Sequence, residues 1–212
     1  MTREAPPAPT RERIRQVAAD LYVLRGHDGF SFGDVAAAIG TTRANIHHHY
    51  GNKHRLMAEL LDGFAGDAEA RIMQHWARPG VPFAQRFHLQ REDLRRFYHH
   101  FNRQPGDRNV WSPLSRLRLD MPVLGEAAMV ALERVNRSYE TCLKQALAEA
   151  VAVGSFSPEI AAEDVVGLLR GTFLSCGPMT QDSGSFAEVE RVLGALERML
   201  NAAWGRGPAQ DR

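Results

Sequence analysis

The stretch FSFGDVAAAIGTTRANIHHHYGNKHR, residues 30–55, indicates the fold class of this chain. It holds two short helical segments that each end at a glycine, and a third segment that opens at Lys53. Ser31 is placed to cap the first segment, with Asp34 as a shorter form of the capping-box acid, and Thr42 is placed to cap the second. Two short helices joined by a tight turn predict a helix-turn-helix, whose second helix has the right size for the major groove of DNA.

The flanking sequence continues the helical pattern in both directions. Residues 10–25 place apolar side chains at three- and four-residue steps, and the helix that opens at Lys53 is expected to continue to about His75. Further helices are expected over residues 83–103, 109–119, 124–153, 158–176 and 185–204. No stretch alternates convincingly between apolar and polar residues as a strand would. The pattern predicts an all-α fold of about nine helices, with an N-terminal three-helix helix-turn-helix head and a C-terminal helical bundle as its body.

Breaks in this pattern suggest how the chain is divided. Residues 1–9 are rich in proline and alanine and are expected to be a disordered tail. The helix-turn-helix domain is expected over residues 10–56, so its boundary falls inside the helix that opens at Lys53. The larger helical body is expected over residues 57–204, and a second disordered tail over residues 205–212.

The composition favours a protein of the cytoplasm. The 212 residues are 44% hydrophobic, contain no apolar run long enough to span a membrane, and begin with a segment unlike a secretory signal. The two cysteines, Cys142 and Cys176, are too few for a disulfide scaffold and are interpreted as small core residues. The formal net charge is only +1, but residues 1–55 carry eight basic and five acidic residues together with five of the nine histidines. The basic end of the chain therefore coincides with the predicted helix-turn-helix.

The order of these elements resembles the tetracycline-repressor (TetR) family of transcriptional regulators. The resemblance rests on a first helix, the segment RGHDGFSFGDVAAAIG, the turn TT, the helix RANIHHHY and a GNK that opens a long helix, and it covers about residues 10–61. It implies a ligand-responsive DNA-binding regulator without catalytic activity or cofactor, most often a repressor. Such a protein binds a palindromic operator as a homodimer, and it is released by a small molecule that enters the C-terminal ligand-binding and dimerisation domain.

The second helix of the motif supplies the expected DNA contacts. Ile46 and Tyr50 lie four residues apart and form its buried side, which leaves short polar side chains facing outward. Arginine can pair with guanine and asparagine with adenine through two hydrogen bonds, and backbone N–H groups at helix starts suit phosphate. Together with the family resemblance, this reasoning predicts DNA contacts by Thr42, Arg43, Ala44, Asn45, His47, His48 and Lys53. The chain departs from the usual residues of the family at Gly33, His47, His49 and Gly51.

The body carries two candidate sites. A mixture of large apolar and a few polar side chains is what a ligand cavity between helices needs, although an ordinary helical core has the same composition. The candidate ligand-binding residues are Phe97, His100, Phe101, Trp111, Leu114, Met121 and Tyr139, with Arg96 and His99 as further polar groups. A strip of small residues and an apolar stripe on the last two helices predict a dimer interface, with packing inside one protomer as the alternative. The candidate interface residues are Gly167, Gly171, Ser175, Val189, Leu193, Leu196 and Leu200.

Other interpretations are weaker or stay open. The histidine run over residues 47–49 does not predict a metal site, because consecutive helical residues point about 100° apart. Partial protonation of these histidines near neutral pH would still make DNA affinity fall as the pH rises. An enzyme would need a convergent set of acids, bases or metal ligands, and the sequence holds no motif of that kind. A transcriptional activator of the same fold, and a helical protein-interaction module without DNA binding, stay open.

Overall fold

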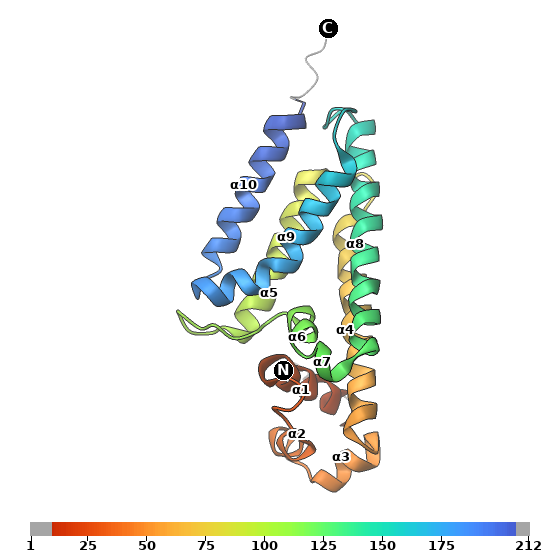
Figure 1. The fold of residues 1–212 in the computed structure, drawn as a ribbon, viewed down its shortest axis with the longest axis vertical. Coiled ribbons are helices and arrows are strands. Elements are labelled where there is room, and N and C mark those ends of the chain that lie inside the picture. Colours follow the sequence, from red (N-terminus) through yellow and green to blue (C-terminus); the bar gives the residue numbers. More distant parts are fainter. Residues whose placement is uncertain (1–9, 207–212) are drawn as a thin grey trace, which may run out of the picture.

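The computed structural model describes residues 10–206 and contains ten α-helices over this range. In chain order the helices are α1 (Thr10–Arg25), α2 (Phe32–Ile39), α3 (Arg43–Tyr50), α4 (Lys53–Trp76), α5 (Phe83–Phe101), α6 (Pro113–Leu119), α7 (Met121–Leu124), α8 (Glu126–Ala152), α9 (Ala162–Ser183) and α10 (Ala187–Trp204). Figure 1 shows an elongated molecule with α1, α2 and α3 at one end and the C-terminal end of α10 at the other. Within the described range the only β-type pairing is an isolated bridge between Phe156 and Gly205, so the all-α prediction is confirmed.

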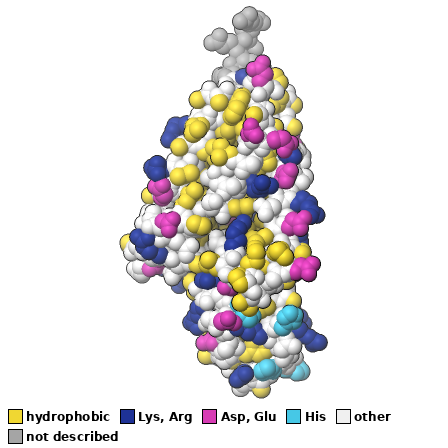
Figure 2. All heavy atoms as spheres, viewed as in Figure 1, with side chains coloured by type: hydrophobic (Ala, Val, Ile, Leu, Met, Phe, Trp, Pro, Cys, Tyr) yellow, Lys and Arg dark blue, Asp and Glu magenta, His cyan; other side chains and the backbone are white. Residues whose placement is uncertain are grey.

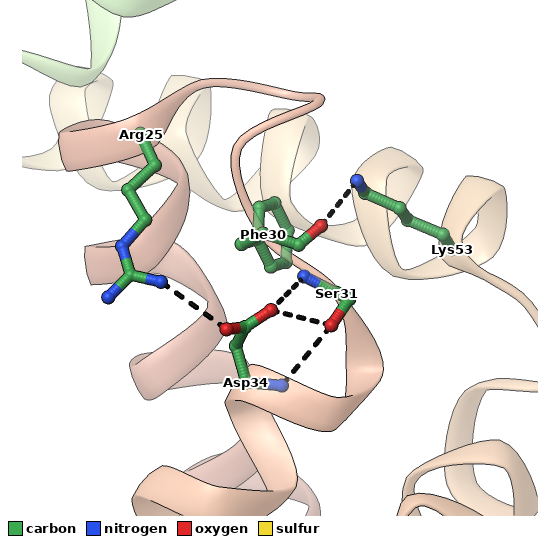
Figure 3. A network of polar contacts seen from close by, with 5 residues as sticks. All are labelled: Arg25, Phe30, Ser31, Asp34 and Lys53. Carbon is green, nitrogen blue, oxygen red and sulfur yellow. Dashed lines mark hydrogen bonds and ion pairs between the residues drawn. The ribbon is translucent and has the colours of Figure 1, made fainter.

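The ends of the head helices are set by local sequence. The Ser31 hydroxyl accepts a hydrogen bond from Asp34 N (3.3 Å) and the Asp34 carboxylate accepts one from Ser31 N (2.7 Å), so the predicted capping box is present (Figure 3). Gly40 then ends α2 with a φ of 72°, in the left-handed region that favours glycine. Thr42 caps α3 by accepting a hydrogen bond from Asn45 N (3.2 Å). These signals explain why α2 and α3 end where the sequence predicts.

Helix α4 belongs to both the head and the body. It is capped by Asn52, whose Oδ1 accepts a hydrogen bond from Arg55 N (2.9 Å), and it runs unbroken to Trp76. In the body α4 packs along α8, α8 packs against α9, and α5 and α10 complete the bundle (Figure 1). The fully buried Trp76 ring lies among the rings of Phe87 and Phe173 in the core. The boundary expected after residue 56 lies within this helix and corresponds to no break in the backbone.

Helix α6 makes a second connection between the head and the body. Arg116 donates from Nε to Val23 O (2.8 Å) and from Nη2 to Leu24 O (2.9 Å), near the C-terminal end of α1. One turn further along, the Asp120 carboxylate accepts a hydrogen bond from His27 N (2.8 Å). The last carbonyls of a helix have no partner inside it and carry the negative end of its dipole, so a guanidinium is well suited to them. The head is therefore held by α6 as well as by α4.

Two predicted helices of the body are shorter or divided in the structure. The helix predicted over residues 109–119 begins only at Pro113, because the Ser112 hydroxyl accepts a hydrogen bond from Ser115 N (3.3 Å) and caps the chain at that point. The helix predicted to start at residue 124 starts at Glu126. Gly125, with a φ of 57°, separates it from the short α7.

Helix α9 begins and ends later than predicted. Its first residue is Ala162 rather than Pro158, and it passes through Pro178 and continues to Ser183. A buried hydrogen bond from Trp111 Nε1 to Thr180 Oγ1 (2.6 Å) holds the chain in place beyond the proline. The loop expected at residues 180–184 is reduced accordingly, since α10 begins at Ala187.

Residues 205 and 206, which are expected to open a disordered C-terminal tail, are paired with another part of the chain. Ser157 N donates to Trp204 O (2.8 Å) and Arg206 N donates to Ser155 O (3.0 Å), so Gly205 and Arg206 pair with the loop that precedes α9. The tail expected over residues 1–9 and the remainder of the C-terminal one, residues 207–212, lie outside the described residues. Among the helices described here, none combines the length and the apolar character needed to cross a membrane.

Candidate DNA-binding surface and internal cavity

Helix α3 presents a solvent-exposed face at one end of the molecule. Ile46 and Tyr50 are buried, as predicted, and the Tyr50 hydroxyl donates to Glu59 of α4 (3.2 Å). The side chains of Thr42, Arg43, Ala44, His47 and His48 are exposed and that of Asn45 is half-buried. Figure 2 shows histidine side chains gathered at this end, where α3 lies. The residues predicted to read DNA therefore share one accessible surface.

Two polar side chains on this surface are held in place before any ligand binds. Asn45 Nδ2 donates to Thr41 Oγ1 (3.0 Å). His47 Nδ1 lies 2.9 Å from Gly51 O, and the ring packs edge-on against Phe32 with 4.8 Å between centroids. Because a carbonyl oxygen can only accept, Nδ1 carries the hydrogen and the neutral His47 ring presents Nε2 as an acceptor. Side chains fixed in this way lose less conformational entropy when a base edge or phosphate binds.

Lys53 makes polar contacts within the protein. Its ammonium group donates to Phe30 O (2.7 Å) and to His27 O, and it lies over the Phe30 ring, 4.5 Å from the centroid (Figure 3). These contacts join the start of α4 to the loop between α1 and α2. Two of the three ammonium hydrogens are used inside the protein, so Lys53 ties these segments together in the structure, and its contact with a phosphate stays a prediction.

Two exposed basic residues in the first turn of α4 were not predicted. His54 and Arg55 follow the Asn52 cap, and both side chains are exposed beside the end of α3. Within the described residues neither Arg43 nor Arg55 is paired with a carboxylate. The signal that identifies these positions is the Asn52 cap, because the residues after a cap occupy the helix N-terminus, where anions are favoured.

Two adjoining hollows lie on the side of the head that faces the body. The smaller one, the inner cavity, has a volume of about 60 Å³ and lies within the body. The larger one, the outer cleft, has a volume of about 340 Å³ and lies between α1 of the head and α4 and α5 of the body. The side chains that line both are Phe64, Arg71, Asp93, Phe97 and Pro113. The two hollows are therefore lined in part by the same side chains.

Most of the predicted ligand-binding residues line these hollows. Phe97 lines both; Trp111, Leu114 and Tyr139 line the inner cavity, and His100, Phe101 and Arg96 line the outer cleft. Met121 lines neither, because it lies on α7 and packs against the core instead, and its prediction is corrected. His99 also lies elsewhere, edge-on against Tyr98.

A buried carboxylate that the sequence reasoning missed stands where the hollows meet. Asp93 of α5 lies 3.3 Å from Arg71, 3.1 Å from Arg96 and 3.5 Å from His75. Burial alone would raise the pKa of Asp93, but the nearby His75 ring and the positive charges of Arg71 and Arg96 outweigh burial and hold this pKa below its usual value. The Arg71 guanidinium also lies over the Phe97 ring, 4.4 Å from its centroid. Arg71 and Asp93 of this charged cluster form part of the lining of both hollows.

The predicted dimer residues divide into two groups. Val189, Leu193, Leu196 and Leu200 of α10 are buried inside the protomer, so the prediction that their side chains form the interface is corrected. On α9, Gly171 and Ser175 are exposed and Gly167 is half-exposed, and a methyl group added at either glycine would meet no other atom within 4 Å. Leu168 and Met199 add exposed apolar area to the same two helices, at 50% and 64% exposure. Hydrophobic side chains cover much of this face in Figure 2.

The geometry of the head defines a class of protein. A short helix, capped at its start and exposed along one polar face, follows α2 across a tight turn and stands clear of the body at one end of the molecule (Figure 1). This is the arrangement of a helix-turn-helix DNA-binding protein, in which the second helix enters the major groove.

Comparison with known proteins identifies the family. Residues 14–60 match the family described as bacterial regulatory proteins, tetR family. The chain is 22% identical over 197 residues to the HTH-type transcriptional repressor KstR2 of Mycolicibacterium smegmatis, covering 90% of this chain and 92% of that one. The chain is thus a transcriptional regulator of the TetR family, as the sequence predicts.

Solved structures share the fold over nearly the whole chain. A TetR transcriptional regulator from Chloroflexus aurantiacus superimposes with a TM-score of 0.76 at 17% identity, covering 93% of this chain and 97% of that one. The reduced form of NemR from E. coli gives a TM-score of 0.73 at 17% identity, with coverages of 94% and 98%. The ketosteroid transcriptional regulator KstR2 of Mycobacterium tuberculosis gives 0.64 at 16% identity, with coverages of 95% and 98%.

Proposed function

We propose that this TetR-family regulator is a repressor that binds a palindromic operator as a homodimer and is released by a small molecule held in the outer cleft and inner cavity. The observation that carries this proposal is the position of the outer cleft. Arg15, Ala19 and Val23 of α1 form one wall, and α4 and α5 form the others, so an occupant touches the head and the body together. A ligand that fits only one relative position of the two parts shifts the population towards that position.

The proposed DNA contacts are those of the exposed face of α3 and the start of α4. Thr42 and the N-terminus of α3 suit a phosphate, and Arg43, Asn45 and His47 suit base edges in the major groove. Arg55 is a further phosphate-binding base at the start of α4, beside Lys53. One head covers a half-site, and a two-fold dimer places two recognition helices roughly 34–36 Å apart or a multiple of this distance.

The proposed dimer interface is the exposed face of α9 and α10. Gly167, Gly171 and Ser175 form a flat strip that allows close approach of another helix, and Leu168 and Met199 supply apolar area. The buried stripe of α10 supports this face from within the protomer. We also propose residues 10–56 as the DNA-binding domain, residues 57–204 as the ligand-binding and dimerisation domain, and the cytoplasm as the location.

The proposed effector is a fairly apolar molecule. The inner cavity is lined chiefly by aromatic and aliphatic side chains, among them Phe64, Trp111 and Leu114. Two relatives of this chain carry the name KstR2, and one of them is described as a ketosteroid transcriptional regulator. An apolar polycyclic compound is therefore a reasonable first candidate.

A gel-shift titration with the DNA upstream of the protein's own coding sequence tests the DNA-binding part. The Asn45→Ala, His47→Ala double variant is expected to lose specific binding while staying folded and dimeric, because it removes two base-reading side chains while the buried Ile46 and Tyr50 still anchor α3. Gln85→Ala, at an exposed position of α5, serves as the control and is expected to bind like the wild type. Unchanged operator affinity in the double variant, or a wild-type affinity that is insensitive to salt, would refute the assignment.

A further inference from the structure

Gln90 is a buried amide in the wall of the inner cavity, and its orientation is fixed by its neighbours. The residue is 2% exposed and lines this cavity from α5. Trp76 Nε1 lies 3.0 Å from one terminal atom of the Gln90 side chain, and the Tyr139 hydroxyl lies 3.2 Å from the same atom. An indole N–H can only donate a hydrogen bond, so this atom is the amide oxygen. The Gln90 Nε2 group therefore takes part in neither of these two hydrogen bonds.

This Nε2 group has two hydrogens to donate and no acceptor among the described residues. The polar side-chain atoms that are both fully enclosed and without a partner are Tyr22 Oη, Ser115 Oγ and the two ring nitrogens of His75. Gln90 Nε2 is not one of them, so it keeps access to open space. Because the Gln90 side chain is otherwise buried, that space is the inner cavity. The cavity thus contains a fixed donor inside largely apolar walls.

We propose that Gln90 Nε2 recognises a carbonyl-type oxygen on an otherwise apolar, aromatic effector. The proposal rests on the proposed function, since it assigns the chemistry of the same effector site. The acetyl-sized inner cavity receives the oxygen, and the apolar rings occupy the outer cleft between Phe64, Phe97 and Phe101.

A matched pair of ligands tests this proposal on the wild-type protein. The probes are 2-acetylnaphthalene and 2-ethylnaphthalene, which have nearly the same shape and differ by a carbonyl in place of a methylene group. In an apolar pocket without a donor the ketone binds more weakly, because its oxygen loses its hydrogen bonds to water. With Gln90 as donor the order reverses, and we expect isothermal titration to give about tenfold tighter binding of the ketone.

Two variants separate the donor from general packing. In Gln90→Met the side chain keeps its length and loses the donor, so the ketone preference is expected to disappear or reverse. Gln85→Met places the same side chain at an exposed position of the same helix and is expected to keep the wild-type preference. The ratio of the two affinities is measured within one protein, so a loss of stability in Gln90→Met does not mimic the effect. If Gln90→Met fails to fold, the wild-type preference decides the matter.

The outcomes distinguish the two proposals. A wild-type protein that binds the hydrocarbon as tightly as the ketone, or more tightly, overturns the role of Gln90 and leaves the effector site in place. A ketone preference that survives in Gln90→Met also overturns it. If neither probe binds, both the Gln90 role and the apolar effector site fail, while operator binding in the gel shift stays a separate result.

Discussion

Arg116 of α6 offers a direct test of how the head is held against the body. Replacing it with methionine keeps most of the apolar stem and removes the guanidinium that caps the end of α1. The two hydrogen bonds, to Val23 O and Leu24 O, are charge-assisted, and each such bond contributes roughly 1.5–3 kcal/mol when its partner is not rehydrated. Arg116 is half-exposed, so water can replace part of this interaction. We expect a net loss of about 2–3 kcal/mol in the free energy of unfolding.

Urea unfolding followed by far-UV circular dichroism measures this loss. With a denaturant slope of roughly 3 kcal/mol per molar, the midpoint of Arg116→Met is expected to fall by about 1 M urea. Arg118→Met is the matched control, because Arg118 lies on the same helix, carries the same charge and bonds only to Leu114 O of its own helix (3.2 Å). Its midpoint is expected to change by no more than the equivalent of about 0.5 kcal/mol.

Equal shifts in the two variants would refute the reasoning. They would mean that removal of any positive charge from α6 has the same effect, and that the bonds to α1 add nothing. A midpoint unchanged in Arg116→Met would likewise show that the α1 carbonyls are as well satisfied by water.

Four further predictions concern other parts of the molecule. Thr42→Ala removes the cap of α3 and is expected to destabilise the protein by about 1 kcal/mol in urea unfolding, whereas an unchanged midpoint would argue against the cap. Because the folded-state pKa of Asp93 lies below the unfolded value of about 3.9, its ionised form stabilises the fold above that pH and the contribution is lost as the pH falls through the lowered pKa. Asp93→Asn is therefore expected to be less stable than the wild type at pH 7 and to show a weaker loss of stability between about pH 4 and pH 2, and parallel pH profiles would contradict this. Gly171→Glu places a charge in open space on α9, so sedimentation is expected to report a folded monomer, and a persistent dimer would remove this face from the interface. Burial raises the pKa of the Cys176 thiol to about 12 and also raises that of Cys142, so both thiols are expected to react with Ellman's reagent only after unfolding, and rapid reaction of the native protein would contradict their burial.

The head could be predicted closely because its signals are local. Gly40, Thr42 and Gly51 each act within one turn of the chain, so the limits of α2 and α3 follow from neighbouring residues. The predicted start of α9 at Pro158, a favoured first helical residue, is wrong. The loop before α9 pairs instead with the chain after α10. Such a pairing joins residues about fifty positions apart and leaves no local mark.

The sites of the body depend on the same distant contacts. The apolar stripe of α10 is visible in the sequence, but whether a second protomer or the protomer's own helices cover it is a property of the fold. Lys53 is a further example. The sequence shows a base at a helix start, which suits a phosphate, but it does not show that the Phe30 carbonyl accepts a hydrogen bond from this base. Gln90 has no sequence signal at all: its role follows from two donors, Trp76 and Tyr139, on two other helices.

Because α4 runs unbroken from Lys53 to Trp76, the length of this helix determines how the head is placed and rotated relative to the body. Each residue of an α-helix advances the chain by 1.5 Å and turns it by about 100°. One residue inserted near Gly66, where a side chain would meet no neighbour within 4 Å, would turn the start of α4 about the helix axis relative to Trp76. The bonds of Arg116 to α1 would then be lost or the helix would have to bulge. Insertions and deletions in α4 should consequently be far less tolerated than in the exposed turn over residues 103–106, which lines neither the inner cavity nor the outer cleft.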